Sequence, residues 1–254
     1  MNLNMKKTIL FLATTIAALT TIFMGCSGDL SATQESETMN SLTQQEINDG
    51  WELLFDGEST EHWRGYGKDG FPDEGWITED GALVFRAPES GSSGLDIITK
   101  ETYSDFELTL EWMISEGGNS GIFYHVLEQD RAIYWSGPEF QILDNINHPD
   151  ADQGVDGNRK SASLYDLIPA QPQNTKPFGE WNSIRIISEG PTIQHWQNGE
   201  KVVEFERWTQ EWFDMLHNSK FNCYPEFGAI RNGHIGLQDH GDEVKFRNIK
   251  IRTL

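Results

Sequence analysis

The sequence is poor in cysteine and in basic residues. Only Cys26 and Cys223 occur in 254 residues, and 19 Lys and Arg stand against 40 Asp and Glu, which gives a formal charge of −21. This charge argues against nucleic-acid binding, because phosphate backbones are bound through basic side chains, and against electrostatic docking on anionic lipid. With so few cysteines, an extracytoplasmic domain would depend on its hydrophobic core rather than on disulfides.

The one long hydrophobic run lies at the N-terminus. Lys6 and Lys7 precede an uncharged apolar stretch, 8–24, which is followed by Gly25 and Cys26. This pattern predicts a signal peptide at residues 1–25. A cysteine directly after a small residue resembles the lipobox of bacterial lipoproteins, although Phe23 stands where leucine is usual. We therefore expect a lipid on Cys26 to be the sole membrane contact and to hold the protein at the cell envelope, in the periplasm or at the outer membrane.

The rest of the chain divides into a tether and one domain. Residues 26–47 are polar and nearly free of aromatics, which is typical of a flexible linker, and residues 48–254 are expected to form the folded domain. Cys223 is expected to be a small buried hydrophobic residue rather than a nucleophile. Nine Trp, six Tyr and fourteen Phe favour strands and also suit sugar-binding surfaces.

Strand patterns dominate the domain. Residues 105–115 alternate apolar and polar side chains, which indicates a strand with one face in the core. Asp80-Gly81 and Asn198-Gly199 lie between apolar runs and predict hairpin turns. One helix is expected at 208–218. Further strands are expected at 51–55, 121–127, 138–143, 163–168, 235–237 and 244–251. Many short strands with little helix predict an all-β sandwich or jelly roll of two antiparallel sheets.

Eight segments in this order carry a family resemblance. They are Gly50-Trp-Glu-Leu-Leu-Phe-Asp-Gly57, Gly118-Asn-Ser-Gly-Ile122, Pro138-Glu-Phe-Gln-Ile-Leu-Asp144, Ser163-Leu-Tyr-Asp166, Trp181-Asn182, Gln197-Asn-Gly199, Gly233-His-Ile-Gly-Leu-Gln-Asp-His-Gly241 and Phe246-Arg-Asn-Ile-Lys-Ile-Arg252. Together they resemble the 3-keto-glycoside lyase and hydratase family, also described as 3-keto-disaccharide hydrolases. The resemblance implies a concanavalin A-like lectin and glucanase jelly roll.

The resemblance also implies a chemistry. A partner oxidoreductase first oxidises the sugar hydroxyl at C3 to a ketone, which acidifies the proton at C2. A base removes that proton, the group at C1 is eliminated, and water adds to the resulting double bond. The site then needs a base near C2, a donor or cation for the enolate oxygen, and an acid for the leaving group.

Candidate catalytic residues come from these segments. Glu139 and Gln141 are two apart on one expected strand, so they share a face. The resemblance makes Glu139 the first choice for the base or a metal ligand, and Gln141 a substrate contact. Histidine side chains can serve as acid or base, and His240 is the second catalytic candidate. Asp144, at a strand end, is a ligand, an acid or a turn-former. The remaining substrate-binding candidates are Gln238, Tyr165, His125, Asn182, Glu111 and Trp135.

Other site types find less support. The glucanase pattern Glu-x-Asp-x-Glu begins at Glu128 but has alanine at position 132, which disfavours a retaining carboxylate pair. The Gly-x-Ser-x-Gly nucleophile motif and an i, i+4 histidine pair for helical zinc are both missing. No cofactor is evident, and a carboxylate-bound divalent cation such as calcium stays open. The alternative functions are a non-catalytic carbohydrate-binding lipoprotein on the same fold and a surface scaffold without a sugar role.

Overall fold

The fold is taken from a computed structural model, in which residues 38–89, 91 and 94–254 are described. The expected signal peptide, Cys26 and the tether up to residue 37 lie outside the described residues. Within the described ranges, none of the helices has the length and apolar character needed to span a membrane.

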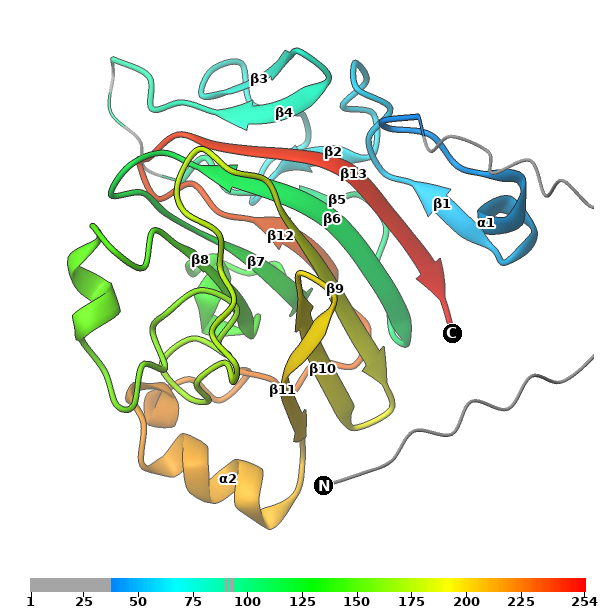
Figure 1. The fold of residues 1–254 in the computed structure, drawn as a ribbon. Helices are drawn as coiled ribbons and strands as arrows, with labels where there is room; N and C mark the ends of the chain where they lie inside the picture. The colour runs from blue at the N-terminus through cyan, green and yellow to red at the C-terminus, as the bar shows by residue number, and fades with distance from the viewer. Residues whose placement is uncertain (1–37, 90, 92–93) are drawn as a thin grey trace, which may run out of the picture. The chain divides into compact units, whose positions relative to one another are not determined.

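The described strands form an eight-stranded and a five-stranded antiparallel sheet, which Figure 1 shows one behind the other. The larger sheet has the order β11 (Glu200–Glu206), β10 (Thr192–Gln197), β9 (Asn182–Glu189), β6 (Phe106–Ile114), β13 (Val244–Thr253), β4 (Ala82–Phe85) and β3 (Trp76–Glu79), with β1 (Trp51–Leu53) also paired to β13. The smaller sheet has the order β2 (Trp63–Gly65), β5 (Ile97–Thr99), β12 (His234–Leu237), β7 (Asn119–Val126) and β8 (Glu139–Leu143). The predicted all-β sandwich is confirmed.

Helices are few. The expected helix is α2 (Gln210–His217), and α1 (Gln44–Asn48) adds a single turn. Short 3₁₀ turns lie at Ile133–Trp135, Pro149–Asp152 and Lys220–Cys223. Both predicted hairpin turns are present, since Asp80, Gly81, Asn198 and Gly199 all have positive φ, as a two-residue turn of this kind requires.

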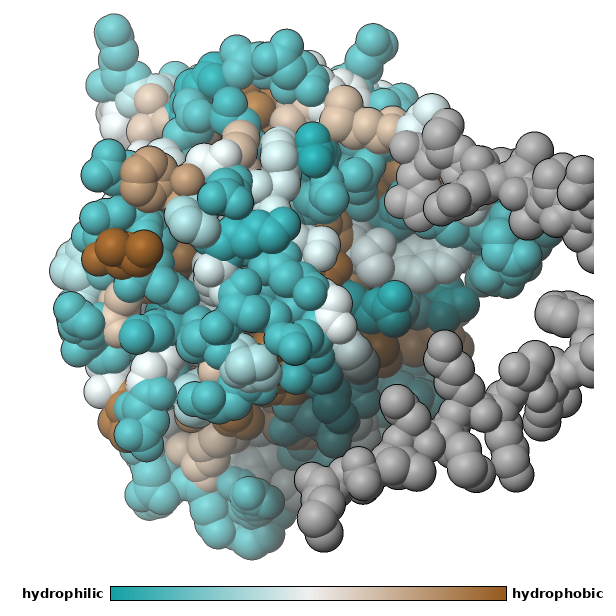
Figure 2. Space-filling model, in the orientation of Figure 1, coloured by the Kyte–Doolittle hydropathy of each residue, from teal (hydrophilic) through white to brown (hydrophobic). Residues whose placement is uncertain are grey.

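The core lies between the two sheets. On β6 the alternating side chains from Phe106 to Ile114 are buried, and on β8 Phe140 and Ile142 face the same core. Burying one such side chain contributes roughly 1.5–3 kcal/mol, so burial in this layer stabilises the sandwich. The face shown in Figure 2 is mainly hydrophilic, with hydrophobic residues scattered over it.

Two expectations about local structure are wrong, and two short strands were not expected. Residues 163–168 form turns with isolated bridges rather than a strand, because the chain reverses at Asp166, which has a positive φ. Strands β2 and β5 were missed, since three residues are too few to show a period. Cys223 is exposed rather than buried, because its 3₁₀ turn lies at the surface.

The domain begins earlier than residue 48. Asn40 is 6% exposed and docks on a bulge of β13. Its backbone N–H donates to Asn248 Oδ1 at 2.6 Å, its Nδ2 donates to the Gly81 carbonyl at 2.7 Å, and its Oδ1 accepts from Asn248 N at 2.8 Å. Glu46 of α1 pairs with Lys250 at 2.6 Å. The C-terminal part of the expected tether, 38–47, therefore packs on the domain.

Candidate active site

A cavity of about 660 Å³ lies on the outer face of the smaller sheet. Residues that pair directly across antiparallel strands share a face. Glu139 pairs with Phe123 and Gln141 with Gly121, while Gln238 N donates to the Gly121 carbonyl at 3.0 Å. Asp96, which directly precedes β5, lies next along this row. The cavity floor therefore contains a cross-strand row of Gln141, Gly121, Gln238 and Asp96 that runs from β8 to β5, and Glu139 belongs to the adjacent row.

Glu139 reaches over β7 because Gly121 has no side chain. A Cβ on Gly121 would lie 2.3 Å from Glu139 Oε1. With its amide nitrogen oriented toward Glu139, Gln141 donates to Glu139 Oε1 at 3.0 Å and to the Ser120 carbonyl at 3.0 Å. The glycine of the Gly-Asn-Ser-Gly-Ile segment thus makes room for the carboxylate, and the glutamine orients it.

Glu139 is 7% exposed. Burial is the main cause that raises the pKa of its carboxyl to about 8; Lys220 acts in the opposite direction, and the charges of Asp96, Asp150 and Asp166 act in the same direction as burial. Burial raises the pKa of a carboxyl because the charged form loses its hydration. A carboxylate with this pKa is a stronger base than an ordinary glutamate.

Lys220 is the cationic side chain of the site. Its Nζ lies 3.5 Å from Asp166 Oδ2 and 4.0 Å from the centre of the Tyr165 ring. The Tyr165 hydroxyl donates to Asp150 Oδ2 at 3.0 Å, and burial raises the pKa of this phenol. The Lys220 ammonium on this wall can stabilise an oxyanion that develops in the cavity, while the phenol proton of Tyr165 is held by Asp150.

The opposite wall is polar and acidic. Asp239 N donates to Asp96 Oδ1 at 2.8 Å, and His240 Nε2 lies 3.5 Å from Asn119 Nδ2. Among the described residues, Asn119 Oδ1 and Gln238 Oε1 are buried without a hydrogen-bond partner. Buried acceptors are rarely left unpaired, so these two oxygens are positioned to accept hydrogen bonds from a ligand.

Aromatic side chains form the rest of the cavity wall. Tyr66, Tyr134, Phe221, Tyr224 and Phe227 line it, and Phe221 stacks on Phe227 with ring centres 4.0 Å apart. Flat apolar faces beside hydroxyl-binding groups suit a molecule with both apolar and polar faces, such as a sugar ring.

A protein-family model matches most of the chain. The model of the 3-keto-alpha-glucoside-1,2-lyase-like domain matches residues 50–252, which include every strand described above except the last residue of β13.

The chain belongs to the 3-keto-alpha-glucoside-1,2-lyase-like family.

Individual relatives resemble the chain over most of its length. It is 42% identical to a 3-keto-disaccharide hydrolase of Bacteroides thetaiotaomicron, in an alignment that covers 98% of this chain and 100% of the relative. A candidate glycosyl hydrolase of Parabacteroides distasonis matches with a TM-score of 0.78 at 31% identity, covering 85% of this chain and 100% of its own. A second structure from that organism, also described as a candidate glycosyl hydrolase, has a TM-score of 0.61 at 28% identity, covering 80% and 99%.

In this member of the 3-keto-alpha-glucoside-1,2-lyase-like family, half of the predicted site residues come together. The cavity is lined by Glu139, Gln141, Tyr165, Gln238 and His240. Trp135 lies just behind the wall, where its ring stacks on Tyr224 with ring centres 4.1 Å apart. The expectation that Glu139, Gln141 and His240 share one cavity agrees with the structure.

Asp144 lies outside the cavity and is engaged as a turn-former. Its carboxylate accepts hydrogen bonds from the backbone N–H groups of Gly117 at 2.8 Å and Ile146 at 3.0 Å, and from Asn147 Nδ2 at 2.7 Å. Of the three roles left open for Asp144, the structure agrees with the turn-forming one and not with an acid in the site.

His125 and Asn182 are also misplaced in the sequence-based assignment. His125 has a positive φ, which breaks the alternation of β7. Its side chain is fully buried, contacts the Ser188 hydroxyl at 2.9 Å, and has a pKa lowered to about 3 by burial. Asn182 is buried as well, and its Oδ1 accepts from Lys176 N at 2.8 Å. Both hold the scaffold together.

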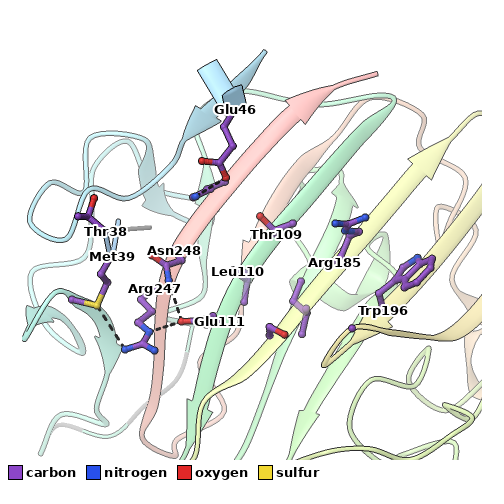
Figure 3. A pocket seen from close by; sticks show the side chains of 14 residues that line it. Thr38, Met39, Glu46, Thr109, Leu110, Glu111, Arg185, Trp196, Arg247 and Asn248 are labelled. Carbon is purple, nitrogen blue, oxygen red and sulfur yellow. Dashed lines mark hydrogen bonds and ion pairs between the residues drawn. The ribbon is translucent and has the colours of Figure 1, made fainter. Parts of the chain in front are cut away.

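Glu111 lies on the other sheet. It faces a groove of about 600 Å³ on the outer face of β6, β9, β10 and β13 (Figure 3). There it pairs with Arg247 at 2.5 Å and accepts from Asn248 Nδ2 at 3.0 Å. Alternation correctly placed Glu111 on a polar face, but that face is not the one that carries Glu139.

Sequence reasoning missed Lys220, Asp96 and three tyrosines of the wall, namely Tyr66, Tyr134 and Tyr224. Lys220 and Asp96 lie outside the alternating runs, and the eight family segments do not contain them. The only local signal was their position in loops beside aromatic residues, which is too common to single them out.

A metal centre gains no geometric support here. Across the described part of the chain, no three His, Cys, Asp or Glu side chains converge as metal ligands would. The suggestion of a divalent cation stays a prediction.

Proposed function

We propose that the protein cleaves 3-keto-glycosides by removing the proton at C2, eliminating the group at C1 and hydrating the product. The observation that carries this proposal is the buried Glu139 carboxyl, with its pKa raised to about 8, in a cavity lined by sugar-compatible groups. The family and the relative named a 3-keto-disaccharide hydrolase support a carbohydrate as the substrate.

Glu139 acts as the base. A ketone at C3 makes the C2 proton acidic, and a carboxylate with a raised pKa is matched to such a weak carbon acid. Gln141 keeps the carboxylate aimed into the cavity through its bond to Oε1. Because the floor below Glu139 is the bare backbone of Gly121, the sugar ring can approach the base closely.

Lys220 stabilises the enolate. The negative charge that forms on the C3 oxygen needs a donor or cation nearby, and Lys220 supplies the cation on the wall that it shares with Tyr165. Asn119 and Gln238 offer unpaired acceptor oxygens that suit the remaining sugar hydroxyls. His240, exposed at the rim, closes the polar end of the cavity.

A non-catalytic binding module is the alternative, and the basic carboxyl in the cavity argues against it. Burying a carboxyl without a charged partner costs free energy, and a site that only binds sugar does not need the basicity that this burial provides.

The test uses a 3-keto-glucoside and the whole mature domain, with Glu139→Gln as the variant. Released aglycone and the absorbance of the enone product report turnover, and calorimetry reports binding. We expect turnover in the wild type and a loss of about 1,000-fold or more in the variant, with binding kept. A fully active Glu139→Gln protein would show that another group is the base.

The cellular setting is also proposed. We propose that a lipid on Cys26 holds the domain outside the cytoplasm, and that a sugar 3-oxidoreductase acts upstream to supply the ketone. The second point follows from chemistry, since elimination at C1 requires the ketone at C3 and the proposed reaction includes no oxidation.

A further inference from the structure

The elimination requires a proton for the departing oxygen, and none of the residues assigned a role so far donates it. When the C1–O bond breaks, its electron pair goes to the glycosidic oxygen, and an alkoxide is a poor leaving group unless an acid protonates it. Glu139 has just received the C2 proton as a base, and Lys220 lies on the wall assigned to the enolate. The departing oxygen needs a further group.

Asp96 has the position for this role. The strand order β5, β12, β7 and β8 places Asp96 at one flank of the cavity and the β8 backbone of Glu139 at the other. Glu139 Oε1 lies over Gly121 of β7, two strand spacings, or roughly 10 Å, from β5. Two side chains that face each other across this distance leave room for a sugar ring between them.

The surroundings of Asp96 favour its protonated form. Burial is the main cause that raises the pKa of its carboxyl to about 7; the hydrogen bond from the Asp239 backbone lowers that pKa, and the charge of Asp239 raises it. The Asp239 carboxylate is itself engaged by backbone N–H groups, from Gly241 at 3.0 Å and from Leu95 at 3.3 Å. Among the described residues, the Asp96 carboxyl accepts one hydrogen bond, from Asp239 N to Oδ1, so Oδ2 is available to a substrate.

We propose that Asp96 is the second proton-transfer residue of this site, donating to the departing glycosidic oxygen during elimination and accepting from water during hydration. The inference rests on the proposed function. It differs from the sequence-based choice of His240, which is exposed at the rim, whereas Asp96 lies deeper at the end of the floor row.

The proton balance closes over the cycle. Glu139 takes the C2 proton, the enolate re-forms the C3 carbonyl as C1=C2 forms, and the leaving oxygen takes the Asp96 proton. In hydration, the Asp96 carboxylate takes a proton from water, the hydroxide adds to C1, and Glu139 returns its proton to C2. Both residues regain their starting states, and no oxidant or reductant is consumed.

Leaving-group dependence tests the inference. A nitrophenyl group departs as a stable anion, whereas a methyl glycoside must lose methanol and needs the acid. For Asp96→Asn we expect a loss of about 100-fold or more in kcat with methyl 3-keto-glucoside, less than tenfold with the nitrophenyl analogue, and accumulation of the enone because hydration is impaired. Asp73→Asn, at an exposed position, is the matched control.

Two further results decide between this role and a structural one. Equal losses on both substrates would overturn the inference, because a folding or packing defect does not distinguish leaving groups. For Asp96→Ala, we expect added formate to restore turnover of the methyl substrate, and failure of rescue would count against Asp96 as the acid. If wild-type protein released neither aglycone, the proposed function itself would be wrong, and the inference with it.

Discussion

Gly121 and Glu139 occupy neighbouring strands in such a way that a side chain on the first would displace the carboxylate of the second. A Cβ at position 121 would lie 2.3 Å from Glu139 Oε1 and 2.9 Å from its Cδ. The glycine has no unusual φ, so its requirement comes from space rather than from backbone conformation. The close approach aims the base across the floor of the cavity.

Gly121→Ala is therefore expected to reduce kcat by about 100-fold, because a displacement of about 1 Å at a reacting group costs roughly this much. Gly70→Ala is the control, since a Cβ there meets nothing within 4 Å. Steady-state kinetics on a 3-keto-glucoside measure turnover, and thermal unfolding measures any change in stability. Unchanged turnover in Gly121→Ala would contradict the assigned position of Glu139.

The pH dependence of turnover follows from Glu139. Its pKa is raised from 4.5 to about 8, so at pH 6 nearly all of the carboxyl is protonated and cannot act as a base. We expect kcat/KM with the nitrophenyl substrate to rise about tenfold per pH unit below pH 7 and to level off above about 8. Lys220 and Asp96 face Glu139 and titrate in the same cavity. The apparent pKa of the pH profile therefore belongs to the three coupled groups rather than to Glu139 alone. An apparent pKa near 4 in this profile would contradict the assignment of the buried Glu139 carboxyl as the base.

Lys220 is expected to act on turnover and not on stability. Lys220→Gln removes the cation proposed to face the enolate, and we expect kcat to fall by about 100- to 1,000-fold. Its ion pair with Asp166 is partly exposed, so unfolding should change by less than about 1 kcal/mol. Lys201→Gln, an exposed lysine paired with Glu204, is the control. A change in KM alone would indicate that Lys220 binds substrate without stabilising the enolate.

The N-terminal anchor of the domain depends on Asn40. Asn40→Ala removes two side-chain hydrogen bonds, to Gly81 and from Asn248, and leaves their partners partly buried. We expect a destabilisation of about 2–3 kcal/mol, measured by urea unfolding. Asn48→Ala, at the exposed end of α1, is expected to change the free energy of unfolding by less than about 0.5 kcal/mol. Equal effects of the two variants would mean that segment 38–47 does not anchor the domain.

Lipidation is tested separately from catalysis. In a bacterial host, we expect labelled fatty acid to be incorporated into wild-type protein and to be absent from Cys26→Ser, while Cys223→Ser keeps the label. Label retained in Cys26→Ser would contradict the proposed anchor. Activity of the isolated domain should be the same in all three proteins, because Cys223 does not line the cavity.

Much of the fold could be read from local patterns. The alternation at 105–115 became β6, and the two Asn-Gly and Asp-Gly pairs became hairpins, because both signals act within a few residues. Strands β2 and β5 could not be found this way, since their three residues are held by neighbours that are distant in sequence. The turn at 163–168 was misread as a strand for the converse reason, because apolar burial there comes from packing against β8.

The functional site shows the same division between what local sequence patterns determine and what the tertiary structure determines. By itself the sequence determined that Glu139 and Gln141 share a strand face and that Glu111 faces away from the core, because side-chain direction alternates along a strand. Only the tertiary structure decided which of these polar faces forms the cavity, and it brought Asp96 and Lys220 to Glu139 from loops far along the chain. The physical reason is that alternation separates the two sides of a strand, whereas strand order and loop packing determine what each side meets.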